Sequence, residues 1–200
     1  MLKTEVQSQF EQLVSKPVWS EFKACGYRKT GNNFRIYNPD GWGKIVNIQK
    51  SAYSDRNEIK FAINTGLYLA KADTIFAEPR AERFLEPDCL IRTRVGYLNG
   101  GNHDSWYELT AQSQPQQIQQ QVMHDVTQFI LPYLDNIHSV DDIVQQMLRE
   151  RRPKSRQAIQ AVFDCGYRRE ASNWVDDEIA ATIYRTWRQE LEALRKTFNQ

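Results

Sequence analysis

The spacing of apolar residues changes twice along this chain, and these changes restrict the folds that it can adopt. Residues 4–25 carry apolar side chains at helical spacing, whereas residues 33–68 alternate between apolar and polar side chains as strands do. After Pro115 the spacing is helical again to the end of the chain. The order of helix, strands and helices predicts an α+β fold with an antiparallel sheet.

The central part of the chain is expected to form a five-stranded antiparallel sheet, packed by an N-terminal helix and several C-terminal helices. Asn38-Pro39-Asp40-Gly41 marks the turn between the first two strands of a meander. Asn99-Gly100-Gly101-Asn102 is typical of a β-hairpin and is expected to join the last two strands. The expected strands are residues 33–38, 43–51, 58–68, 88–98 and 105–110.

Proline and charge indicate where the helices break. Pro17 interrupts the first helix, which is therefore expected to be kinked, with Ser15 able to cap its second part. The segment RERRPKSR, residues 149–156, indicates a charged hinge. The hinge predicts an α+β domain at residues 1–148 and a helical extension at residues 149–200, packed on the same domain.

The tetrapeptide CGYR occurs twice, at Cys25–Arg28 and at Cys165–Arg168. In each copy a helical pattern ends at the cysteine, and the glycine can adopt the left-handed conformation that closes a helix. The first copy leads into a strand, whereas Asn173 is expected to cap one long last helix that starts near Trp174. The repeat therefore predicts two helix ends built alike rather than a duplicated ligand loop.

Charge and cysteine content exclude several classes of protein. The net charge of +1 excludes a strong attraction of the whole protein to nucleic acid or to an anionic membrane. The three cysteines have no CxxC spacing, which favours reduced thiols. No apolar run is long enough to span a membrane, and the N-terminus lacks the pattern of a secretory signal. We therefore expect a cytoplasmic protein that uses no cofactor.

Short motifs between residues 26 and 134 occur in the order found in a known family. They are Gly26–Phe34, Ile48–Lys50, Phe61–Gly66, Arg94–Gly96, Asp104–Tyr107 and Ile130–Leu134. With them, residues 5–150 resemble a bacterial family described as domain of unknown function 4304. Tyr27 departs from the pattern, because such sequences more often have Phe at that place. The family has no established activity, so the resemblance implies a domain and no mechanism.

Alternation along the strands predicts a polar sheet face opposite the core. It carries four cations with amide side chains between them, and such a face can bind a phosphate, a carboxylate or an acidic protein surface. The alternative is a solvated face crossed by acidic residues of the C-terminal helices. The candidate binding residues are Arg35, Lys60, Asn64, Arg92, Arg94, Asp104 and Trp106. Asn47, Gln49 and Glu108 are expected to lie among or beside them.

Catalysis is expected only if several polar groups converge. His103 and Asp104 can supply acid and base chemistry together with Arg92 and Arg94, as in a hydrolase or a nucleic-acid-processing enzyme. The alternative is that His103 and Asp104 are turn residues and that Asp104 pairs with Arg94. The histidines and cysteines lack the spacing of metal ligands, so no metal site is expected.

These observations favour a non-enzymatic binding protein whose partner is another protein, as in an immunity-like or regulatory role. The polar face, the last helix or both would contact the partner. Trp187 and Leu191 belong to an apolar stripe at seven-residue spacing, which can pair with the same helix of a second chain in a homodimer. Nucleic acid is not an expected partner, because the sequence carries no aromatic-rich ribonucleoprotein motif.

Overall fold

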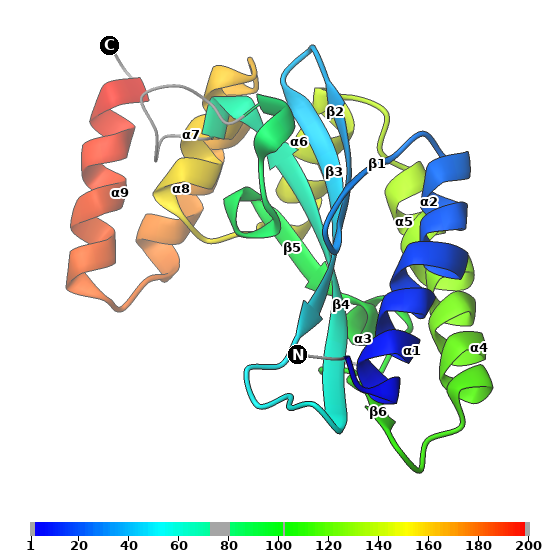
Figure 1. Ribbon diagram of the computed structural model, residues 1–200. Helices are drawn as coiled ribbons and strands as arrows, with labels where there is room; N and C mark the ends of the chain where they lie inside the picture. The colour runs from blue at the N-terminus through cyan, green and yellow to red at the C-terminus, as the bar shows by residue number, and fades with distance from the viewer. Residues whose placement is uncertain (1–2, 73–80, 102, 199–200) are drawn as a thin grey trace.

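An antiparallel sheet lies at the centre of the molecule, with helices on both sides (Figure 1). The computed structural model describes residues 3–72, 81–101 and 103–198. The strands are β1 (Arg28–Thr30), β2 (Asn33–Asn38), β3 (Trp42–Lys50), β4 (Glu58–Leu69), β5 (Ile91–Arg94) and β6 (Tyr107–Thr110). The helices are α1 (Glu5–Leu13), α2 (Trp19–Ala24), α3 (Val95–Leu98), α4 (Pro115–Asp125), α5 (Leu131–Asp135), α6 (Val140–Glu150), α7 (Arg156–Asp164), α8 (Arg168–Ala181) and α9 (Arg185–Phe198). The α+β prediction is confirmed.

The first strands follow the predicted meander. β2, β3 and β4 pair in sequence order, and the turn between β2 and β3 contains Gly41 with a φ of +89°. One further strand, β1, pairs with β2 in the register Arg28↔Arg35. It escaped prediction because three residues are too few to show an alternation.

The predicted hairpin between the last two strands is wrong. β5 and β6 both pair with β4, one after the other along the edge opposite β3, in the registers Asn64↔Arg94 and Phe61↔Tyr107. The 12 residues of β4 are long enough to hold both. The chain leaves β5 as helix α3, where the returning loop packs so closely on Gly96 that a Cβ there would lie 2.0 Å from the His103 carbonyl oxygen.

The predicted core face of the sheet is buried under the N-terminal helices and α4–α5. Phe61 meets Phe10 of α1 edge to face at 5.2 Å, and Phe34 stacks on Phe22 of α2 at 4.9 Å. These aromatic contacts add to the burial of apolar area that holds the layers together. Figure 1 shows α1, α2, α4 and α5 on one side of the sheet and α7–α9 on the other.

Side-chain oxygens start three of the helices as N-caps. Thr4 accepts a hydrogen bond from the Gln7 backbone N–H, and Ser155 accepts one from Ala158. Ser139 accepts from the backbone N–H of Asp142, the pairing that their spacing predicts. Such caps satisfy backbone donors that a helix leaves free at its start.

The kink expected at Pro17 is a π-helical turn, Val14–Val18, between α1 and α2. Proline has no N–H to donate, and a wider turn accommodates that loss without ending the helix. Ser15 does not cap the second part, because its hydroxyl donates to the Glu11 carbonyl oxygen at 2.5 Å. Ser15 lies inside a continuous helical segment, where a serine hydroxyl can reach the carbonyl oxygen of the residue one turn earlier.

The last helical region consists of two helices rather than one. α8 already begins at Arg168, so Asn173 lies inside it and caps nothing. α8 ends where Thr182 adopts an extended conformation and its carbonyl oxygen accepts a hydrogen bond from Arg188. In α9, Leu191 is buried against α7 and α8 of the same chain and Trp187 is half-buried, whereas Ile183, which precedes the helix, is 87% exposed. The homodimer through this stripe stays a prediction.

Most of the buried apolar side chains form one large cluster that extends from Val6 of α1 to Leu194 of α9. The end of α7 contacts the turn after β4, where Lys71 Nζ donates to the Asp164 carbonyl oxygen at 2.9 Å. The division of the chain at residue 149 stays a prediction. In the described ranges no helix is both long enough and apolar enough to cross a membrane.

Candidate functional site

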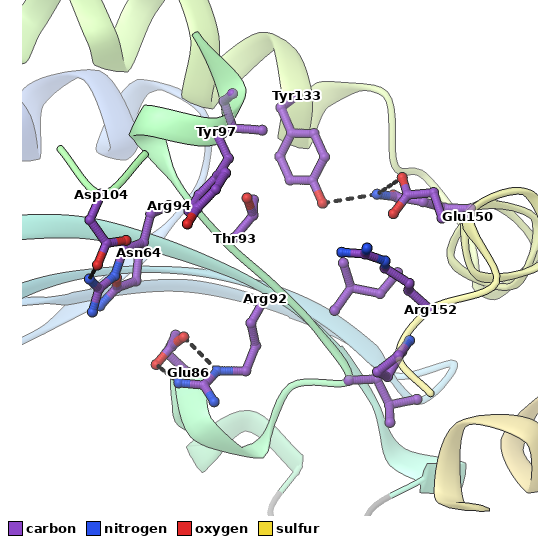
Figure 2. A pocket seen from close by; sticks show the side chains of 15 residues that line it. Asn64, Glu86, Arg92, Thr93, Arg94, Tyr97, Asp104, Tyr133, Glu150 and Arg152 are labelled. Carbon is purple, nitrogen blue, oxygen red and sulfur yellow. Dashed lines mark hydrogen bonds and ion pairs between the residues drawn. The ribbon is translucent and has the colours of Figure 1, made fainter. Parts of the chain in front are cut away.

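A groove of about 780 Å³ runs beside β5 and contains several of the candidate residues. Figure 2 shows its floor on β5 and its walls on the surrounding segments, with Tyr97 from α3, Tyr133 from α5 and Glu150 from α6. The floor consists of Arg92, Thr93 and Arg94. The groove therefore joins a sheet edge to helices that are distant in the sequence.

A row of polar side chains crosses the sheet and ends at this groove. It runs over four neighbouring strands through Asn33, Asn47, Asn64 and Arg94. Asn47 Nδ2 donates to Asn33 Oδ1 at 2.8 Å, and Asn64 Nδ2 lies 3.4 Å from Asn47 Oδ1. Arg94 Nε then donates to Asn64 Oδ1 at 2.8 Å. This polar row exists because the strand register places the four residues opposite one another.

Arg94 connects the polar row to the loop after α3. Its Nη1 lies 2.6 Å from Asp104 Oδ2, and its guanidinium lies 5.3 Å from the centre of the Trp106 ring. The pairing of Asp104 with Arg94, one of the two alternatives drawn from the sequence, is present. Arg94 is thereby held by an amide, a carboxylate and an aromatic ring at once.

Arg92 points away from this cluster and holds a second acidic residue. Its Nε and Nη2 donate to the two carboxylate oxygens of Glu86 at 2.7 and 3.1 Å. These hydrogen bonds raise the pKa of Arg92. Glu86 is buried, and a buried carboxylate requires such a partner. Arg92 therefore stabilises the groove floor by neutralising a buried carboxylate.

The far wall of the groove carries polar residues that the sequence did not single out. Gln146 Nε2 donates to the Tyr133 hydroxyl and to Glu150 Oε1, each at 3.1 Å, and burial raises the pKa of Tyr133. Figure 2 shows the Arg152 side chain directed into the groove. Within residues 3–72, 81–101 and 103–198 no acidic side chain pairs with Arg152.

Residues 18–136 match a family described as Domain of unknown function (DUF4304). The chain belongs to this family. No curated protein and no solved structure matches the DUF4304 chain. The family match begins one residue before α2 and ends just after α5, so it contains the sheet and Tyr133. Gln146, Glu150 and Arg152 lie beyond it. The groove therefore forms where the family domain meets the segment C-terminal to it.

The remaining candidate binding residues of the DUF4304 chain lie outside this groove. Arg35 Nη1 donates to the carbonyl oxygen of Phe84 at 2.9 Å. Lys60 Nζ lies 2.9 Å from Glu58 and 3.7 Å from Glu108, near the other end of β4. Arg35 and Lys60 thus hold local structure, while the groove gathers Asn64, Arg92, Arg94 and Asp104.

One end of the predicted polar face is covered by the chain itself. A second, smaller core forms there from Ile45, Tyr68, Phe84 and Cys89, in which Tyr68 stacks on Phe84 at 4.4 Å. Ile45 and Tyr68 are large apolar side chains on the strand face that was assigned as polar, and they were the signal in the sequence for this cover. The end beside β5 and the Asp104 loop lies in the groove described above, and Arg35 lies in a second groove at the opposite edge of the sheet.

The groups of the enzyme alternative converge only in part. Arg92, Arg94 and Asp104 line the groove, whereas the exposed His103 is not among the lining residues. A Cβ on Gly101 would lie 3.0 Å from His103 Nε2, so the imidazole lies over its own loop. In the described part of the chain, no group of three or more His, Cys, Asp or Glu side chains is placed to hold a metal ion.

Proposed function

We propose that this DUF4304 chain is a non-enzymatic binding protein of the cytoplasm, and that its partner is another protein. The groove beside β5 is the observation that carries the proposal, because it is open, holds charged side chains of both signs and is lined by the exposed ring of Tyr97. The exposed ring of Trp106 lies beside Arg94. Tyr97 is 52% exposed and Trp106 is 42% exposed. Tyrosine, tryptophan and arginine are the residues most enriched where protein interfaces bind tightly.

Preorganisation of the groove supports the same function. Arg92 and Arg94 are held in fixed positions by Glu86 and Asp104, so a partner would not have to immobilise these long side chains. The paired charges also make the groove selective, since a partner has to match an arrangement of both signs. The proposal includes an immunity-like or regulatory role, because proteins of both kinds act by capturing a partner protein.

The cytoplasmic location is proposed from the cysteines. Cys25, Cys89 and Cys165 are all free, and Cys25 is exposed to solvent. A free exposed thiol is ordinary in a reducing compartment and uncommon outside it.

The hydrolase alternative is less well supported than protein binding. Its two arginines already hold carboxylates, and its histidine lies outside the groove. No pair of groups that resembles a base and a nucleophile lines the groove in the described ranges. We therefore retain protein binding as the proposed function.

Photo-crosslinking tests this proposal in cells that naturally express the chain. A benzophenone amino acid replaces Tyr97 at the groove, and in a matched strain it replaces Tyr53, which is 95% exposed and lies in the loop before β4. We expect the benzophenone at position 97 to form a covalent adduct with one protein. An adduct of the same mass should be absent from the strain with the benzophenone at position 53. Equal adducts from both positions, or none from position 97, would contradict the proposal.

The test avoids charge reversal at Arg92 or Arg94 for a structural reason. Reversal at Arg92 would leave the buried Glu86 beside a second negative charge, and the fold would be destabilised whether or not a partner exists. Tyr97 has no hydrogen bond in the described part of the chain and is 52% exposed, so its replacement breaks no hydrogen bond that holds the fold.

A further inference from the structure

We propose that the partner contributes an extended segment that adds to the sheet at β5, with an acidic side chain of that segment bound by Arg152. This inference rests on the proposed function and specifies how the groove would bind. It follows from the position of β5 in the sheet and from the charges of the groove.

The outer edge of β5 faces the groove. In the described part of the chain β5 pairs only with β4, through all four of its residues. Consecutive side chains of a strand point to opposite faces of its sheet. The groove is nevertheless lined by the consecutive residues Arg92, Thr93 and Arg94, so it runs along the strand edge and does not lie on one face.

A free strand edge offers backbone donors and acceptors in a fixed order. Proteins commonly protect such an edge with proline, a bulge or a covering segment, since it can pair with another chain. β5, with the sequence IRTR, contains no proline, and its edge opens into a groove of about 780 Å³. An added strand would use the backbone groups for affinity and the walls for side-chain specificity.

The dimensions suit a short extended segment. Four residues in a strand span about 13 Å, and pockets of roughly 300–1,000 Å³ bind ligands of this size range. Tyr97 and Leu90 both line the groove and can contact side chains of such a segment. The segment is therefore expected to be linear rather than helical.

The charges of the groove select an acidic residue in this segment. Arg92 is paired with Glu86 and Arg94 with Asp104, whereas Arg152 is paired with no acidic side chain of the described residues. The planar fork of an arginine matches a carboxylate with two parallel hydrogen bonds, and a carboxylate is the oxyanion that the side chains of an unmodified protein segment carry. Glu150 lines the same wall as Arg152, and its carboxylate is held by Gln146. Because like charges repel, the carboxylate of the bound segment is expected beside Arg152 and away from Glu150.

The experiment starts from a displayed library of random linear decapeptides, selected on the full chain. The selected peptide that binds the full chain most tightly is synthesised with an N-methyl group at each backbone amide in turn. We expect N-methylation at alternate residues to weaken binding at least about tenfold, because only every second amide of an added strand faces β5. Binding that is insensitive to N-methylation, or sensitive without alternation, would overturn strand addition.

Matched arginine variants test the charge. Arg152→Gln is expected to weaken the peptide about tenfold, and Arg156→Gln is the control, because Arg156 is exposed at the start of α7 outside the groove. Replacing the acidic residue of the peptide by its amide should cost the wild-type chain about tenfold and Arg152→Gln almost nothing. Equal losses in both chains would overturn the role of Arg152.

The outcomes separate this inference from the proposed function. A crosslinked protein from position 97, together with a library that yields no linear peptide that binds, would support a binding protein and overturn strand addition. The opposite result is that no crosslink forms in cells but a selected peptide shows alternating sensitivity to N-methylation. It would support the groove as a peptide site and count against a protein partner in those cells.

Discussion

The two CGYR segments have the same local structure in two different settings. Both cysteines end a helix, and the next residues, Gly26 and Gly166, have φ angles of +82° and +99°. In each copy the glycine N–H bonds three residues back and the tyrosine N–H bonds five residues back, at 3.0 to 3.2 Å. These two hydrogen bonds are those of a Schellman motif, which satisfies the last carbonyl groups of a helix.

The settings differ in the contacts of each tyrosine and in the element that comes after it. Tyr27 is 4% exposed, meets Phe22 edge to face at 5.2 Å and leads into β1. Tyr167 is half-buried and leads at once into α8. The first copy lies inside the family match and the second outside it. A local motif therefore determines how a helix ends, and packing determines how much that end contributes to stability.

Removing the two rings is expected to give the largest contrast. Tyr27→Ala should lower the free energy of unfolding by about 3–5 kcal/mol, as for other buried aromatic rings, because the site beside Phe22 cannot collapse. Tyr167→Ala should lower it by about half as much or less, since solvent already reaches that ring. Equilibrium unfolding in urea measures both values. Equal losses would mean that the two settings contribute alike.

Alanine at the two glycines should give similar and smaller losses. A Cβ at Gly26 or Gly166 would meet nothing within 4 Å, so the cost comes from the left-handed backbone alone, about 1–2 kcal/mol in each case. Asparagine at the same positions is the control, because it tolerates this conformation and should cost less. A loss at one glycine several times that at the other, in the same urea measurement, would contradict the shared motif.

Removing only the Tyr27 hydroxyl should have the smallest effect and a dependence on pH. The hydroxyl is buried and finds no hydrogen-bond partner among the described residues, so Tyr27→Phe should leave stability at pH 7 unchanged or about 1 kcal/mol higher. Burial raises the pKa of Tyr27, so the folded state keeps its proton above pH 10 while the unfolded state loses it. That difference lowers the stability of the wild-type chain as pH rises above 10.

Tyr27→Phe should therefore lose less stability than the wild-type chain between pH 9 and pH 11. Unfolding in urea at several pH values measures the difference, with Tyr167→Phe as the variant of the second copy. If the free energy of unfolding depends on pH in the same way for Tyr27→Phe and the wild type, the pKa of Tyr27 is the same in the folded and unfolded states.

Much of the fold could be predicted because its signals are local. The alternation in NFRIYN placed β2 at Asn33–Asn38, and the helix ends at Cys25 and Cys165 were predicted from a few neighbouring residues. The hairpin prediction failed because a turn signal at Asn99 does not specify which strand the segment after the turn pairs with. The long β4 supplied pairing partners for both β5 and β6 instead.

The part of the site that was predicted from the sequence lies mainly on the strands of the sheet. Asn64 and Arg94 meet because strand alternation and register bring them together, and alternation is visible in the sequence. Asp104 reaches Arg94 from the loop after α3, ten residues further along the chain. Arg152 and Tyr133 reach the same groove from segments that are distant in the sequence, and no local pattern announces that approach.

The sequence by itself determined the α+β class, the helix ends and the two faces of the main strands, because backbone preference and apolar spacing act over a few residues. Tertiary structure decided which cations are paired, which half of the polar face is covered and where the groove opens. These depend on contacts such as that of Arg92 with Glu86, whose energy arises only when packing brings charged and buried groups together.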